Sequence, residues 1–318
     1  MVVDILTNTK LNYNINKFGL ILAIGLVIGL TLFASGCAEK EDGAIDGAEV
    51  TSPVTEAAEF SEPVRIGYVL WDGEIASTNV IQQVLEQAGY EDVEITAVDV
   101  GPLYQGLVSG QFDFTTTAWL PHTQQSYWET YGDQIDYVHV NLEDCRIGLV
   151  VPAYVTIDSI EELNSEKEKF NGRIIGIEPG SGTMEITESV VSEYDLDMEL
   201  VSGSGTAMAA SLKKAIDSEE WAVVVLWTPH WSFNRWDLKY LDDPKGVYGD
   251  ADNVVTLAKL DLEEEKPNLY GILTRFQWTH DDIQAVMMDI ENGMKPEEAA
   301  EKWVENNQEK VNEWIGEE

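Results

Sequence analysis

Three tryptophans, Trp71, Trp119 and Trp227, each close a short apolar run. The runs are Ile66 to Trp71, Phe112 to Trp119 and Ala222 to Trp227. A quaternary ammonium has no N–H group to donate, so a protein holds it with the electron-rich faces of aromatic rings, each worth about 0.5–2 kcal/mol. Any one of these tryptophans can equally pack in a core. Their shared position at the ends of runs indicates an aromatic cage for such a cation.

A loop rich in glycine and serine is the candidate site for an anion. It spans Glu178 to Met184, reads EPGSGTM, and follows a fourth apolar run, Ile174 to Glu178. Glycine lets the backbone approach an anion, and a helix that begins near Thr183 would present free N–H groups and the positive end of its dipole. A turn of this composition is often merely structural. If the loop binds a ligand, a carboxylate on the caged molecule is the expected group.

Strands and helices have to bring these segments together. Residues 76–89, 206–216 and 279–314 repeat apolar side chains at helical spacing, with a break at 293–296 in the last segment. Strands that alternate with helices predict an α/β fold with mostly parallel sheets flanked by helices. Ligands of such sheets bind beyond the C-terminal ends of the strands, which is where the tryptophans stand.

A short internal echo indicates two lobes. Trp119-Leu120-Pro121-His122 returns as Trp227-Thr228-Pro229-His230, and Gly180-Ser181-Gly182-Thr183 returns as Gly203-Ser204-Gly205-Thr206. The surrounding residues differ, so this is no true repeat. The length of 318 residues allows two domains of ordinary size. We therefore expect a ligand cleft between two facing lobes.

The N-terminal 36 residues have the pattern of a secretion signal. Two lysines precede an apolar run from Phe18 to Phe33, and small residues lead to Cys37. The segment resembles a lipoprotein signal, so we expect residues 1–36 to be removed and Cys37 to carry lipid, which would anchor an extracytoplasmic protein to the outer face of the cell membrane. An uncleaved anchor or a plain signal peptide is the alternative. Residues 37–63 are acidic and poor in large apolar groups, which predicts a flexible linker.

Composition and missing motifs exclude several function classes. Fifty-eight acidic and nineteen basic residues give a formal charge of −39, which argues against nucleic acid and anionic lipid surfaces as partners. The chain has no serine-hydrolase elbow, dinucleotide fingerprint or P-loop, and its histidines and cysteines form no metal motif. We therefore expect no enzyme, no cofactor and no metal site. With Cys37 lipidated, Cys145 is a lone thiol that we expect to be buried.

Five motifs together resemble the glycine betaine substrate-binding proteins of ABC transporters. They occur in order from about Val64 to the C-terminus: Tyr68 to Thr78 (YVLWDGEIAST), Ala118 to Thr123 (AWLPHT), Gly176 to Gly182 (GIEPGSG), Leu226 to Trp231 (LWTPHW) and Leu238 to Lys245 (LKYLDDPK). The resemblance implies a two-lobed, periplasmic-binding-protein-like fold of type II that closes on its ligand and delivers an osmoprotectant to a transporter permease. Lobe I would hold residues 64–148 and 255–318, and lobe II residues 149–254.

The same resemblance implies the ligand site. Trp71, Trp119 and Trp227 would enclose the trimethylammonium group of glycine betaine or a similar zwitterion such as proline betaine. The backbone of Gly182 and Thr183 would hold its carboxylate.

One position departs from the family. Similar proteins have a carboxylate-binding histidine five residues after the second tryptophan, where this chain has Gln124, with a histidine earlier at His122. We expect Gln124 or His122 to contact the carboxylate, with a preference for Gln124, and His230 to be structural. Related choline binders carry an extra aromatic residue where this chain has Ile147, which favours betaine. A choline- or carnitine-preferring protein and a sensor domain of the same fold are the alternatives.

Overall fold

The computed structural model describes residues 59–317, so the predicted signal segment, Cys37 and most of the predicted linker lie outside the described residues. The strands are β1 (Val64–Tyr68), β2 (Val93–Ala97), β3 (Phe114–Leu120), β4 (Ile135–Pro152), β5 (Arg173–Ile175), β6 (Glu199–Val201), β7 (Val224–Thr228), β8 (Leu238–Tyr240) and β9 (Asp252–Lys259). The helices are α2 (Asp72–Gln87), α3 (Val100–Val108), α4 (Gln125–Tyr131), η1 (Gly132–Gln134), η2 (Ile160–Phe170), α5 (Gly182–Glu193), α6 (Gly205–Asp217), α7 (Ser232–Arg235), α8 (Leu262–Glu265), α9 (Pro267–Leu273), α10 (His280–Glu291), α11 (Pro296–Asn306) and α12 (Gln308–Ile315). Within this part of the chain, no helix combines the length and the apolar character needed to cross a membrane.

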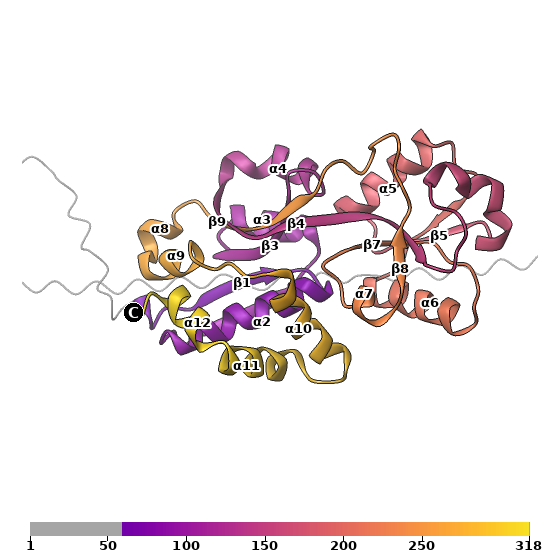
Figure 1. Ribbon diagram of the computed structural model, residues 1–318. Coiled ribbons are helices and arrows are strands. Elements are labelled where there is room, and N and C mark those ends of the chain that lie inside the picture. The colour runs from indigo at the N-terminus through magenta and orange to yellow at the C-terminus, as the bar shows by residue number, and fades with distance from the viewer. Residues whose placement is uncertain (1–58, 318) are drawn as a thin grey trace, which may run out of the picture. The chain divides into compact units, whose positions relative to one another are not determined.

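The strands follow the order β2-β1-β3-β9-β4-β7-β5-β6, with β8 paired to β4. Strand β1 runs parallel to β2 and β3, and β5 runs parallel to β6 and β7, whereas β4 and β9 are antiparallel to their neighbours. With helices packed around these strands (Figure 1), the predicted α/β fold is confirmed. The strands are mixed, with four parallel and four antiparallel pairings, rather than mostly parallel as the sequence predicted.

The long strand β4 joins two groups of strands, as Figure 1 shows. Its residues 135–145 pair with β9, and its residues 146–152 pair with β7 and β8. We call the group of β1, β2, β3 and β9, with its helices, the first lobe, and the group of β5, β6, β7 and β8, with its helices, the second lobe. The chain enters the second lobe within β4 and returns between β8 and β9. The sequence boundaries given above for the two lobes stay a prediction.

Helix α2 begins at Asp72, immediately after Trp71. This is four residues before residue 76, where the sequence predicts the helix to begin. Asp72 and Glu74 lie in its first turn, where negative charge is favourable beside the positive end of the helix dipole. Its buried side chains include Val80 and Leu85, and helices α10, α11 and α12 pack beside it in the first lobe (Figure 1). Helix α2 is therefore firmly packed, and it begins directly after Trp71.

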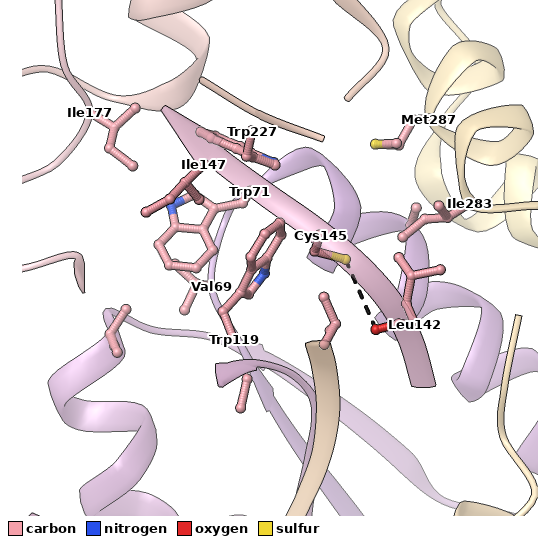
Figure 2. Packing of buried hydrophobic residues seen from close by; sticks show 14 of the residues in the cluster. Val69, Trp71, Trp119, Leu142, Cys145, Ile147, Ile177, Trp227, Ile283 and Met287 are labelled. Atoms are coloured by element: carbon pink, nitrogen blue, oxygen red, sulfur yellow. Dashed lines mark hydrogen bonds between the residues drawn. The ribbon is translucent and has the colours of Figure 1, made fainter. Parts of the chain in front are cut away.

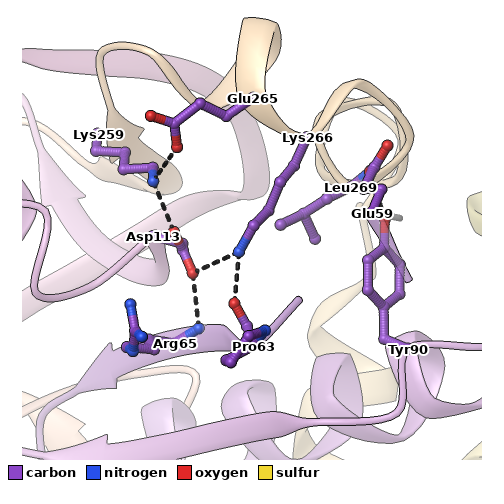
Figure 3. A network of polar contacts seen from close by, with 9 residues as sticks. All are labelled: Glu59, Pro63, Arg65, Tyr90, Asp113, Lys259, Glu265, Lys266 and Leu269. Atoms are coloured by element: carbon purple, nitrogen blue, oxygen red, sulfur yellow. Dashed lines mark hydrogen bonds and ion pairs between the residues drawn. The ribbon is translucent and has the colours of Figure 1, made fainter. Parts of the chain in front are cut away.

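A buried ion network ties together the strand ends of the first lobe (Figure 3). Asp113 accepts a hydrogen bond from the backbone N–H of Arg65 at 2.8 Å, and its oxygens lie 3.0 Å from Lys259 Nζ and 3.1 Å from Lys266 Nζ. Burial alone would raise the pKa of Asp113, but the Arg65 N–H and the two lysines outweigh it and lower that pKa. Because Lys266 is 4% exposed, loss of the Asp113 carboxylate would leave a buried ammonium without its counter-charge.

Residues 59–63 differ from the prediction of a flexible linker. Glu59 is 1% exposed, and its Oε1 accepts hydrogen bonds from Tyr90 Oη at 2.7 Å and from the N–H of Leu269 at 2.8 Å. A carboxylate at this place satisfies N–H groups at the start of α9 and complements the helix dipole. These residues therefore belong to the folded part of the chain.

Candidate functional site

Trp71, Trp119 and Trp227 border one small cavity (Figure 2). Trp71 stands between β1 and α2, and Trp119 lies in β3, so both belong to the first lobe, whereas Trp227 lies in β7 of the second lobe. The ring centres of Trp71 and Trp227 are 6.3 Å apart with their planes inclined by 54°. The cavity is bounded by these rings together with Thr123, Ile147, Ile177 and Thr183. The structure thus brings the three predicted rings together from opposite lobes.

Both first-lobe rings are held at their N–H edges by carboxylates. The indole N–H of Trp119 donates to Oε1 of Glu74 at 2.8 Å, and the indole N–H of Trp71 donates to Oε1 of Glu178. Glu178 follows β5 in the second lobe, so the bond from Trp71 crosses between the lobes. Each carboxylate therefore engages the edge of a ring and not the electron-rich face with which a cation would interact.

Gly182 and Thr183 are the first residues of α5, whose N-cap is Ser181. The N–H groups of a first helical turn have no acceptor within the helix, and the helix dipole at that end favours an anion. Gly182 also lies against the first lobe, since a Cβ built on it would stand 1.5 Å from the carbonyl oxygen of Thr123. The approach of α5 to the first lobe therefore requires glycine at this position.

The structure distinguishes the surroundings of Gln124 and His122. Gln124 is fully buried, its Oε1 accepts a hydrogen bond from Tyr104 Oη at 2.9 Å, and its Nε2 has no partner among the described residues. The His122 ring packs on Gly249. Neither side chain borders the tryptophan cavity itself, but the backbone nitrogen of Gln124 lies 3.4 Å from a Cβ built on Gly182. The backbone of Gln124 thus lies beside the α5 N-terminus, and its buried side chain carries an amide donor without a partner among the described residues.

A residue from far along the chain holds the turn that follows Trp119. Asp252, at the start of β9, accepts hydrogen bonds from the N–H of His122 at 2.7 Å and the N–H of Thr123 at 2.8 Å, and from the Thr123 hydroxyl. Sequence analysis did not single out Asp252 or Thr123. No local signal marks Asp252, because its role arises only from the pairing of β9 with β3.

His230 links the Trp227 loop to the first lobe. Its Nδ1 accepts a hydrogen bond from the N–H of Ser232 at 3.1 Å, and its Nε2 lies 3.2 Å from Oδ2 of Asp72, the residue after Trp71. The His230 ring meets the Trp227 ring edge-on, with centres 5.0 Å apart. His230 therefore supports the cage from outside it, in keeping with the structural role that we expected.

Glu74 is a further site residue that sequence analysis missed. It stands within the motif YVLWDGEIAST, but an acidic residue in the first turn of a helix is commonly a solvated partner of the helix dipole. What distinguishes Glu74 is its burial, at 2% exposed, and its bond to Trp119. Neither property is visible in the sequence.

The remaining reactive groups give no sign of other chemistry in the described part of the chain. Residues 59–317 contain no group of three His, Cys, Asp or Glu side chains arranged to hold a metal ion. Cys145 is buried beside the cage (Figure 2), and burial raises the pKa of its thiol above the ordinary range. A thiol of that kind is unreactive, so Cys145 acts as a packing residue.

Residues 62–306 match the family model of the substrate-binding domain of ABC-type glycine betaine transport systems. A glycine betaine/carnitine transport binding protein of Listeria monocytogenes, GbuC, is 44% identical over 150 residues, which is 46% of this chain and only half, 50%, of that relative. Lactococcal OpuAC, solved closed with glycine betaine, is 41% identical with a TM-score of 0.77, covering 80% of this chain and 100% of that one. An ABC-transporter choline-binding protein in complex with choline is 25% identical with a TM-score of 0.75, covering 80% and 91%.

The family match extends over most of the chain and includes every tryptophan, glycine and carboxylate of the site described above. The structural matches have the two-lobed fold of type II binding proteins, which confirms the predicted fold class. The chain therefore belongs to the family of substrate-binding domains of ABC-type glycine betaine transport systems.

Proposed function

We propose that this protein is the extracytoplasmic binding component of an ABC importer that captures glycine betaine or a similar methylated zwitterion. The observation that carries this proposal is the convergence of three indole rings from two lobes on one cavity. Three faces at about 0.5–2 kcal/mol each supply a large part of the roughly 8 kcal/mol of a micromolar complex. The family match and the likeness to betaine-binding OpuAC support the same ligand class.

Each end of the ligand meets a different kind of group. Trp71, Trp119 and Trp227 would surround the trimethylammonium group, and the N–H groups of Gly182 and Thr183 would bind the carboxylate. Gln124 Nε2, buried without a partner among the described residues, would donate a further hydrogen bond to the carboxylate. Satisfying a buried donor makes that contact favourable.

Capture would couple to closure of the lobes. Two hydrogen bonds already cross between the lobes around the cavity, from Trp71 to Glu178 and from Tyr127 Oη to the carbonyl oxygen of Gly180 at 2.8 Å. His230 Nε2 also lies 3.2 Å from Asp72 across the same boundary. A ligand held by Trp71 and Trp119 on one side and by Trp227 on the other stabilises the same arrangement. Binding energy would thereby select the closed form that a transporter permease receives.

The mode of attachment and the lack of catalysis belong to the same proposal. Cys37 would carry the lipid that holds the protein at the outer face of the cell membrane. As a binding component of an importer, the protein would release its ligand chemically unchanged.

The alternatives differ in the ligand or in its use. Ile147 borders the cavity where related choline binders have an aromatic side chain, which favours betaine over choline. Carnitine is the second candidate, since the name of the relative GbuC includes it. A sensor domain of the same fold would bind the same ligand without transport, and dependence of betaine uptake on this gene in cells separates the two.

Isothermal titration of the purified protein with glycine betaine, proline betaine, choline and carnitine tests the ligand. We expect glycine betaine or proline betaine to bind in the micromolar range or tighter, and choline to bind more weakly. If only choline or only carnitine binds, that compound and not betaine is the ligand of this protein. Failure of all four to bind would refute the cage as a quaternary ammonium site.

A further inference from the structure

Glu74 is a carboxylate buried behind the cage. It lies in the first turn of α2 and is 2% exposed. Its Oε1 accepts the indole N–H of Trp119, and its Oε2 has no hydrogen-bond partner among residues 59–317. Glu74 also borders a second small cavity, which shares Trp119 and Trp227 with the cage. A charge at this position acts on the cage through Trp119, from the side where its indole N–H is bound.

The surroundings of Glu74 do not compensate its charge. Burial, with smaller contributions from Asp72 and Glu178, raises the pKa of Glu74 to about 7, against the hydrogen bonds from Trp119 and from its own backbone N–H. A carboxylate without a cation partner is costly to bury. Groups held at such a cost gather at functional sites, where a ligand supplies what the protein lacks.

We propose that Glu74 is a positioning residue of the cage, which supplies negative charge behind Trp119 and so makes the cage prefer a cation to a neutral group of the same shape. This inference rests on the proposed function. By accepting the indole N–H, the carboxylate orients the ring and makes its face more negative. The charge also attracts the ligand cation directly, and screening is weak between buried groups.

The same geometry couples ligand capture to a proton. A cation in the cage favours the ionised form of Glu74, so a protonated Glu74 must release its proton when the ligand binds. The groups that face Glu74 are Asp72 on the same helix, Glu178 after β5 and Cys145 on β4, and His230 of the second lobe pairs with Asp72. If ligand binding lowers the pKa of Glu74 by about one to two units, betaine affinity falls by about five- to tenfold between about pH 8 and pH 6.

The test compares two ligands on two proteins. One ligand is glycine betaine, and the other is tert-butylacetate, in which carbon replaces the charged nitrogen without changing the shape. Both are titrated into the wild type and the Glu74→Gln variant at about pH 6, 7 and 8. The glutamine keeps an oxygen for the Trp119 N–H but removes the charge.

We expect Glu74→Gln to weaken glycine betaine binding at about pH 8 by about tenfold or more, the equivalent of one pKa unit of coupling. Binding of tert-butylacetate should stay unchanged or tighten, and the pH dependence of betaine binding should disappear. A residue that merely supports the fold would weaken both ligands alike and leave the pH profile intact, which would overturn the proposal.

Two further measurements keep the outcomes distinct. Glu188→Gln, which removes one exposed glutamate from α5, is the control for the loss of a carboxylate outside the cage and should keep the wild-type affinity and pH profile. The wild-type profile needs no variant, so a betaine affinity that does not change between about pH 8 and pH 6 overturns the inference even if Glu74→Gln fails to fold. If the wild type binds no betaine at any pH, the proposed function itself is refuted.

Discussion

Replacing Glu74 by glutamine should stabilise the ligand-free protein at alkaline pH. The carboxylate has a pKa of about 7 in the folded chain, against an ordinary value of 4.5, because burial penalises its charge. The folded state therefore binds this proton more tightly than the unfolded state does. The penalty is fully present above about pH 7 and is relieved as the pH falls through 7 towards 4.5.

The magnitude follows from the difference between the two pKa values. A shift of this size, from 4.5 to about 7, corresponds to about 3 kcal/mol at most. The side-chain NH₂ group of the glutamine would lack a hydrogen-bond acceptor. Burying a neutral amide nevertheless costs far less free energy than burying a charged carboxylate. We therefore expect Glu74→Gln to raise the free energy of unfolding at about pH 8 by about 1–3 kcal/mol, and by progressively less as the pH approaches 5.

Urea unfolding of both proteins without ligand, at several pH values, measures this difference. Glu188→Gln is the matched control, because it removes one exposed glutamate from α5 and should change stability by less than about 0.5 kcal/mol. A Glu74→Gln variant that is less stable than the wild type at about pH 8, or whose advantage does not shrink on acidification, would refute the reasoning. A stabilised variant that has lost affinity for betaine would mark Glu74 as a residue kept for binding at a cost in stability.

Three other substitutions test the remaining parts of the account. Trp227→Ala should weaken glycine betaine binding by about 1–3 kcal/mol in calorimetry, and an unchanged affinity would contradict the cage. Gly182→Ala should abolish closure and betaine binding with little loss of stability, because the new Cβ would lie 1.5 Å from the Thr123 carbonyl oxygen. Small-angle scattering with and without betaine measures closure. A variant that becomes as compact as the wild type on adding betaine would contradict this reasoning. Asp113→Asn should lower the free energy of unfolding by about 3–5 kcal/mol, because it strands the buried Lys266, and a loss below about 1 kcal/mol in urea would contradict the network.

The sequence by itself indicated the class of the fold and the three tryptophans that lie together in it. Trp71, Trp119 and Trp227 stand at the ends of apolar runs, and the C-terminal ends of neighbouring parallel strands meet at one edge of a sheet. The glycines of the EPGSGTM loop predicted an approach of the backbone to an anion, whereas the close approach that the structure shows at Gly182 is to the carbonyl oxygen of Thr123. Such features depend on local order along the chain, and for this reason they can be read from it.

Only the tertiary structure decided which groups surround that cage. Glu74 and Asp252 look like ordinary acidic residues of a strongly acidic chain, and their burial against Trp119 and Thr123 follows from how α2 and β9 pack against β3. The carboxylate of Glu178 reaches Trp71 only because β4 carries the chain from one lobe into the other. Burial and contacts between residues far apart in sequence arise from tertiary packing. Tertiary packing therefore determines which charged groups lie beside each tryptophan ring.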